Sequence, residues 1–264
     1  MGVLPTTKEE IPYSQELIDK IMGLRIIDDT FFRVFANDKY AITEIIKTIT
    51  GAGVEIIDSN PQVYLTSFLR EGIVDSFNLL KDNSYCIIEM QNEKKHNDLK
   101  RCRFYSSLVT VNKTDSNMEF KDIPNVAVLY IKDYTDGDTT PLTVLSNGDG
   151  YTVYMVNSII DDNSTVSDLM KVITTSDIQI TDKKIEDKYP NIYKRFNALK
   201  RNKEVISAMC KVMEDYANEK SAERENLMVK IIELINKGLN DSDIMKQLSC
   251  TIEQISKTRI ALGK

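Results

Sequence analysis

The chain has 264 residues, of which 42% are hydrophobic and 28% are charged, and its formal net charge is −6. This length can bury a full hydrophobic core in one or two domains. The acidic balance argues against a surface devoted throughout to nucleic acid. No apolar run approaches the roughly 18 residues that a membrane span needs, and no charged-then-apolar leader is found. We therefore expect a cytoplasmic protein without membrane contact.

The cysteine and histidine content excludes several kinds of site. The four cysteines are widely spaced and form no C-x-x-C pair, which is typical of a reduced cytosolic protein. The only histidine, His96, lies in a charged segment that resembles a solvated loop or helix start. A thiol-based zinc site and a Ser-His-Asp or Cys-His catalytic group are therefore disfavoured.

The N-terminal quarter predicts an arm, two helices and two short strands. Residues 1–20 are polar without a strong period and predict a loosely ordered arm. An aromatic helical turn follows at residues 30–35. In residues 41–49 the isoleucines recur at helical spacing, and Gly51 stops the helix. Two β-like runs come next, at residues 54–57 and 62–68.

Two neighbouring apolar strands then each carry one carboxylate, Asp75 and Glu89. If the polar segment 81–83 forms the hairpin loop between them, counting outward places Asp75 opposite Glu89. Facing residues have Cβ atoms about 4.5–5.5 Å apart, and two charges there repel by several kcal/mol at an effective dielectric of about 20. Gln91 shares the face of Glu89 because side chains alternate along a strand. A divalent cation is the simplest group that offsets the repulsion.

These residues predict a site for Mg²⁺ or Mn²⁺, because both ions prefer hard oxygen ligands. Asp75 and Glu89 would be the metal ligands, with the polar group of Gln91 beside them. Mg²⁺ takes one or two carboxylates and leaves positions for a phosphate oxygen, so the arrangement suits phosphodiester hydrolysis. Asp29, just before the aromatic turn, is the best placed additional acid.

A simpler interpretation is that the two carboxylates make ordinary ion pairs. Asp75 would cap the hairpin or pair with Arg70 or Lys81, and Glu89 would pair with Arg101. Surface pairs of this kind are common and nearly neutral in energy. The apolar surroundings of Glu89 favour the metal site.

The middle of the chain predicts a mixed α/β layer structure. A helix at about residues 97–111 has Leu99 and other apolar residues on one side, and residues 125–131 and 151–156 are typical of strands. Strands around a central helix, with helices at each end, indicate two packed layers. From residue 161 onward the pattern is helical, so a soft domain boundary falls near residue 160.

The helical C-terminal region, residues 161–264, ends in a three-helix pattern at residues 223–264. An amphipathic helix at 225–237, a short helix capped by Asn240 and a helix with capping-box spacing from Thr251 resemble a helix-turn-helix unit. A small helical cap or dimer contact fits this acidic segment at least as well.

Two segments are locally basic. Residues 183–203 contain eight Lys or Arg against two acids, and residues 94–103 contain five Lys or Arg against one acid. Such segments can contact phosphates, although a solvated helix face is the more common explanation.

Over residues 24–157 the chain resembles the PD-(D/E)XK nucleases labelled as transposases, a group that includes recombination-promoting nucleases. The resemblance lies in residues 29–33 beginning with Asp29, in Asp75, in Glu89 followed by Met90 and Gln91, and in an Arg-x-x-x-Tyr pair, with residues 154–157 as a further strand of the family's kind. The pair is Arg101 and Tyr105, which share a helix face.

The resemblance implies a restriction-endonuclease-like mixed sheet flanked by helices at residues 21–160, and Mg²⁺-dependent cleavage of DNA. It implies catalytic roles for Asp29, Asp75, Glu89 and Gln91, and substrate contacts for Arg101 and Tyr105. It also implies a homodimer and a link to DNA recombination or mobile elements. The chain departs from the family at two points. Gln91 stands where the superfamily has lysine, and Asp75 is not preceded by the proline of a Pro-Asp pair. A non-cleaving DNA-binding or regulatory module, or a structural assembly protein, are the competing hypotheses.

Overall fold

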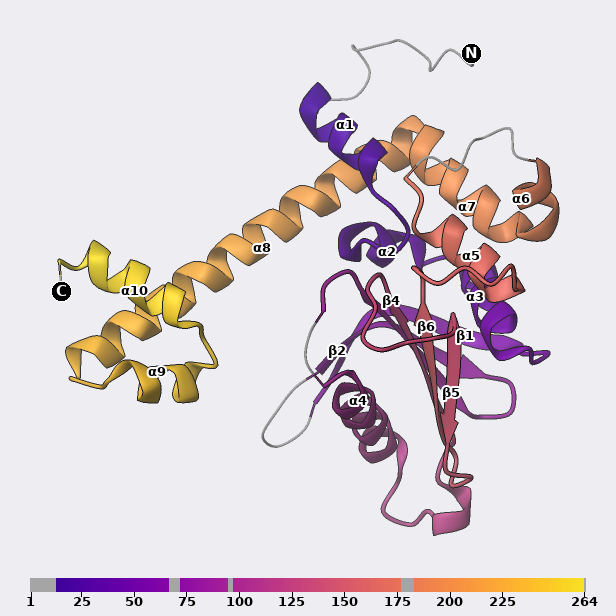
Figure 1. Cartoon of the computed structure of the whole chain (residues 1–264), viewed down its shortest axis with the longest axis horizontal. Coiled ribbons are helices and arrows are strands. Elements are labelled where there is room, and N and C mark those ends of the chain that lie inside the picture. Colours follow the sequence, from indigo (N-terminus) through magenta and orange to yellow (C-terminus); the bar gives the residue numbers. More distant parts are fainter. Residues whose placement is uncertain (1–12, 67–71, 95–96, 177–182, 264) are drawn as a thin grey trace. The chain divides into compact units, whose positions relative to one another are not determined.

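The computed structural model describes residues 13–66, 72–94, 97–176 and 183–263 (Figure 1). Its contacts divide the chain into two compact units, one ending at Cys210 and one beginning at Lys211. The first unit is an α/β structure and the second is helical. Most of the segment predicted to be an N-terminal arm lies outside the described residues, and the helix α1 (Gln15–Gly23) forms at its end.

The first unit is built on a six-stranded mixed sheet with the order β1-β2-β3-β4-β6-β5. The inner strands β3, β4 and β6 are parallel, whereas β1, β2 and β5 each pair antiparallel with their neighbours. The strands are β1 (Ile56–Leu65), β2 (Gly72–Leu80), β3 (Tyr85–Gln91), β4 (Val126–Lys132), β5 (Leu142–Ser146) and β6 (Tyr151–Asn157). The two short runs predicted at 54–57 and 62–68 thus contribute to one strand, β1, which has an irregular register between Ile56 and Asp58.

The β2–β3 hairpin forms in the register predicted from its turn. The Leu80 N–H donates to the Ser84 carbonyl at 2.9 Å, so residues 81–83 are the loop. Asn83 takes the left-handed conformation that such a loop requires, with φ of 63°. The register pairs Ser76 with Ile88, and its next step sets Asp75 against Glu89.

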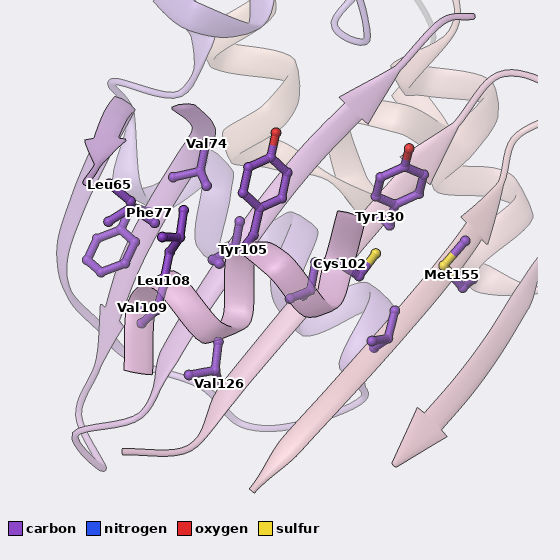
Figure 2. Close-up of a cluster of buried hydrophobic side chains, with 13 residues drawn as sticks. Leu65, Val74, Phe77, Cys102, Tyr105, Leu108, Val109, Val126, Tyr130 and Met155 are labelled. Atoms are coloured by element: carbon purple, nitrogen blue, oxygen red, sulfur yellow. The ribbon is translucent and has the colours of Figure 1, made fainter. Parts of the chain in front are cut away.

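One face of the sheet is covered by α4 (Asp98–Lys113). Cys102, Tyr105, Leu108 and Val109 of α4 pack with strand side chains such as Tyr130 in a single apolar cluster, which Figure 2 shows. Leu99 was predicted to lie on the apolar side, and this was wrong: 52% of its surface is exposed. The helical period explains the error, because Leu99 lies one residue away from the buried row that begins at Asp98.

Other helices of the first unit pack away from α4. α2 (Asp29–Phe35), α3 (Lys39–Thr50) and α5 (Thr165–Ile173) contact the strands, and α7 (Pro190–Arg201) packs on α2 and α3. The aromatic rings of Phe31 and Phe196 meet at 5.6 Å between centroids. The short helices η1 (Phe120–Asp122) and α6 (Lys183–Lys188) complete the unit. The helices α5, α6 and α7, which follow residue 160, therefore belong to the same compact unit as the sheet.

The basic segment 183–203 contributes two cations to this helical packing. The buried Lys200 ammonium donates to three carbonyls at the end of α1, those of Ile21, Met22 and Leu24, at 2.6–2.8 Å. The Arg195 guanidinium donates to the Val34 and Phe35 carbonyls at the end of α2. Cations at helix C-termini satisfy the last carbonyls and oppose the helix dipole, so these two side chains have structural roles.

The second unit has a small core of its own. It contains most of α8 (Lys203–Asn236), together with α9 (Asp241–Leu248) and α10 (Ile252–Ala261). Ile231, Leu234, Ile235, Ile244, Cys250 and Ile255 form its buried cluster. The predicted caps are confirmed: the Asn240 side chain accepts the Asp243 N–H, and Thr251 and Gln254 form a capping box. The helix predicted at 225–237 is the end of the much longer α8.

No helix among the described residues is long and apolar enough to cross a membrane.

A candidate metal and phosphate site

The two strand carboxylates are held against each other by backbone N–H groups. The Asp75 N–H donates to Glu89 Oε1 at 3.3 Å, and Asp75 Oδ2 accepts the Met90 N–H at 2.8 Å. Each acid is therefore anchored to the strand that carries the other. This reciprocal bonding fixes two carboxylates at one point of the β2–β3 hairpin, as the register predicts.

Asp29 reaches the same place from the first turn of α2. The Gln62 amide of β1 lies between the two aspartates, with Nε2 at 3.5 Å from Asp29 Oδ1 and 3.4 Å from Asp75 Oδ1. Gln62 has a φ of 52°, which is uncommon for a residue with a side chain and costs about 1–3 kcal/mol. Such strain is often found at functional sites. The polar sequence around Gln62 contains no pattern that distinguishes it, so its contribution was not predicted.

The predicted Arg101–Tyr105 pair faces the carboxylates from α4. Arg101 donates from Nε and Nη2 to the Tyr105 hydroxyl at 3.2 and 3.1 Å, and from Nη1 to Gln91 Oε1 at 3.1 Å. Its Nη2 lies 3.8 Å from Glu89 Oε2. The predicted residues Asp29, Asp75, Glu89, Gln91, Arg101 and Tyr105 thus meet in one site.

The electrostatics of the site are dominated by Glu89, whose side chain is only 1% exposed. Burial raises the pKa of the Glu89 carboxyl well above its usual range, and the charges of Asp75 and Asp29 raise it further. Arg101 acts in the opposite direction. Burial and the charge of Glu89 also raise the pKa of Tyr105 to about 12, so its hydroxyl stays neutral. Among the described side chains of the site are three carboxyls and one guanidinium, a composition typical of a cation site.

The donor set fits Mg²⁺ or Mn²⁺ better than a softer metal, because it consists of carboxylate oxygens. A carboxylate oxygen has two lone pairs, so it can accept a hydrogen bond and bind a cation at the same time. Within the described ranges, no group of three or more His, Cys, Asp or Glu side chains has a metal-holding arrangement. A cation here would therefore be held by two carboxylates with water and substrate oxygens, which Mg²⁺ accepts.

The simpler ion-pair interpretation is borne out for Glu89, whereas the pairing of Asp75 with Lys81 is not. Lys81 pairs at 2.8 Å with Glu55, which directly precedes β1, rather than with Asp75. Arg70 and His96 lie outside the described residues. Arg101 does approach Glu89, but it makes its shorter contacts with Gln91 and Tyr105. Arg101 thus approaches Glu89 while the two backbone hydrogen bonds keep Asp75 and Glu89 side by side.

Several residues that the sequence did not single out position α4. Asp98, the first residue of the helix, accepts hydrogen bonds from the hydroxyls of Tyr130 at 3.2 Å and Tyr134 at 2.9 Å. At the other strand, Gly72 lies so close to α4 that an added Cβ would be 2.8 Å from Leu108 and 3.0 Å from Tyr105. Both contacts join residues distant in sequence, and neither follows from a local pattern.

No protein-family model, curated protein or solved structure matches this chain.

Proposed function

We propose that the protein is a Mg²⁺- or Mn²⁺-dependent endonuclease that hydrolyses phosphodiester bonds in DNA, with a restriction-endonuclease-like fold of the PD-(D/E)XK kind. The observation that carries the proposal is the buried Glu89 carboxylate set against Asp75, with Arg101 beside them. Burial beside Asp75 opposes ionisation of Glu89 unless a cation offsets the charge, and a carboxyl perturbed in this way among convergent polar groups marks a candidate functional site. A role in DNA recombination or mobile elements, in a homodimer, follows from the same family resemblance.

Asp75 and Glu89 are the residues that would hold the cation. When bound, a divalent cation lowers the pKa of water and offsets the charge that develops on a scissile phosphate. Asp29 would stand at the open side, where the Gln62 amide keeps it directed towards Asp75. An acid in this position can accept a proton from water or orient it.

Arg101 supplies the positive charge that the resemblance expects at position 91. Its guanidinium bonds Gln91 Oε1, which leaves the amide nitrogen of Gln91 as the end that can donate to water or to a phosphate oxygen. Tyr105 holds Arg101 through two hydrogen bonds, so the planar guanidinium is oriented before substrate binds. Arginine in a fixed orientation suits phosphate oxygens because it can donate two parallel hydrogen bonds.

A second candidate function is a DNA-binding or regulatory module that cleaves weakly or not at all. The neutral Gln91 favours it, since an amide activates water less well than a lysine. The two functions differ in whether a metal-dependent product forms.

The test is cleavage of supercoiled and single-stranded DNA with Mg²⁺, Mn²⁺ or EDTA. We expect nicked or shortened products with either metal, and a loss of at least about 100-fold in Asp75→Asn and in Glu89→Gln, since each removes a metal ligand. Glu119→Gln is the matched control, because Glu119 is exposed and pairs with the equally exposed Lys121. Cleavage that survives both site substitutions would overturn the assignment, and metal-independent DNA retention without cleavage would favour the second candidate.

A further inference from the structure

A groove with a mainly apolar lining and two cations lies on the opposite flank of α4 from the carboxylates. It has a volume of about 330 Å³ and is lined by Leu99, Lys100 and Arg103 of α4 and by Leu145, Asn147, Tyr151 and Val153 of the β5–β6 hairpin. Arg101 and Tyr105 face the carboxylates. Around the helix axis, Lys100 lies about 100° from Arg101 and Arg103 about 160° from it in the same direction. The helix α4 is therefore a wall of both the site and the groove.

The two cations of this groove, Lys100 and Arg103, make no ion pair within the described part of the chain. Both side chains are exposed. Asp149, in the turn of the β5–β6 hairpin, accepts the Tyr151 N–H at 3.1 Å. Two cations with free donors on one helix face, at i and i+3, are arranged to meet an anion.

Of the other lining residues, Tyr151 supplies an aromatic ring and Asn147 supplies an amide. Tyr151 is half-buried and packs against the core cluster under α4, so its ring is fixed in place. Burial raises the pKa of Tyr151 to about 12, and its hydroxyl therefore stays a neutral donor. The exposed Asn147, in the β5–β6 turn, offers both a donor and an acceptor.

We propose that this groove binds one nucleotide of an unpaired nucleic-acid strand. Lys100 and Arg103 would contact its phosphates, and Tyr151 with Leu99 would hold its base. Cations combined with an aromatic surface are the features that bind single strands, and a base can reach such a surface only outside a duplex. The volume lies at the lower end of the roughly 300–1,000 Å³ range of small-ligand sites, which suits one nucleotide rather than several.

The inference rests on the proposed function in one respect, that both need nucleic acid as the ligand. It adds a substrate class to that function, because a strand held on one flank of α4 continues past Arg101 towards the carboxylates on the other. Nucleotide binding in the groove requires neither metal nor cleavage, so the two can be tested separately.

The experiment measures fluorescence anisotropy of a labelled 12-nucleotide single-stranded DNA with the full chain in EDTA, where the metal-dependent reaction does not occur. Wild type is compared with Lys100→Gln/Arg103→Gln and with the matched control Lys39→Gln/Lys47→Gln, which removes two exposed cations from α3. We expect at least about a 10-fold loss of affinity for the first pair and less than about 2-fold for the control. The slope of log affinity against log salt should fall by about 1.4, since each phosphate contact on a single strand contributes about 0.7.

The ring is tested by Tyr151→Phe, which should keep the affinity, and Tyr151→Leu, which should lose about 5- to 100-fold. Thermal melting of both variants checks that they fold. Equal losses of affinity in the two double variants, or an unchanged affinity in Tyr151→Leu, would overturn the proposal that the groove binds a nucleotide. A duplex that binds as tightly as the single strand, with the same dependence on Lys100 and Arg103, would overturn the unpaired-strand assignment. Groove-dependent binding without any cleavage would support nucleotide binding in the groove and contradict the proposed nuclease activity. Cleavage without groove-dependent binding would support the nuclease and contradict nucleotide binding in the groove.

Discussion

Replacing Glu89 by glutamine should stabilise the metal-free protein at neutral pH. Glu89 is 1% exposed and lies near two other carboxylates, so its folded-state pKa is raised. The folded state then keeps a proton that the unfolded state releases. The contribution of Glu89 to the free energy of unfolding is therefore greatest below the unfolded pKa of about 4.3. It falls as the pH rises towards the folded pKa and is constant above it. A glutamine of the same shape removes this loss.

The magnitude follows from proton linkage. One proton retained only by the folded state lowers the unfolding free energy by up to about 1.4 kcal/mol for each pH unit within that window. For a unit of this size, 1 kcal/mol shifts the melting temperature by about 2–4 °C, so the Glu89→Gln advantage should grow by about 3–6 °C per pH unit. Other titrating groups are common to both proteins and cancel in the difference.

The assay is thermal and urea unfolding between pH 4 and 8 in EDTA, with Glu119→Gln as the exposed control. Added Mg²⁺ should then reverse the order, because only wild type retains both ligands: at 100 times the dissociation constant it gains about 2.7 kcal/mol. Parallel pH profiles for wild type and Glu89→Gln would refute the reasoning, since they would show that Glu89 has the same pKa in both states.

Three further predictions concern the elements around the carboxylates. Tyr105→Phe removes the acceptor that holds Arg101 and should lower single-turnover cleavage by about 10-fold, while urea unfolding shows a loss below about 1.5 kcal/mol. Gln91→Lys should lower cleavage rather than raise it, because a second cation would displace Arg101; a gain in the same assay would show that the missing charge limits the reaction. Gly72→Ala forces a Cβ to 2.8 Å from Leu108 and should cost about 1–3 kcal/mol in urea unfolding, with no change expected in a Gly53→Ala control.

The parts of the structure that depend on local pattern could be predicted from the sequence. The hairpin register followed from the loop 81–83 alone, and the caps at Asn240 and Thr251 followed from residue type. In both cases the interaction joins residues close together in the chain. The pairing of Asp75 with Glu89 could be predicted because it follows from counting outward from this loop.

Contacts between distant residues could not be predicted. Gln62 joins Asp29 to Asp75 only because β1 lies beside β2 and takes an unusual φ, and neither fact has a signature in its neighbours. Lys200 belongs to a segment that suggests phosphate binding, yet it is buried under α1, where three carbonyls hold it. Composition describes how many charges a segment carries, whereas packing decides which of them reach solvent.

The position of Arg101 changes the meaning of the glutamine at position 91. A lysine at this position would extend from β3 and deliver its own charge, but it would have to be buried among apolar strand residues. Here the charge is that of Arg101 on α4, and the Gln91 carbonyl oxygen accepts a hydrogen bond from it. Asp98 holds α4 in place through the hydroxyls of Tyr130 and Tyr134. The charge thus depends on the docking of a helix rather than on one side chain. Because the same helix carries Lys100 and Arg103 on its other flank, a shift of α4 would alter both the carboxylate site and the groove.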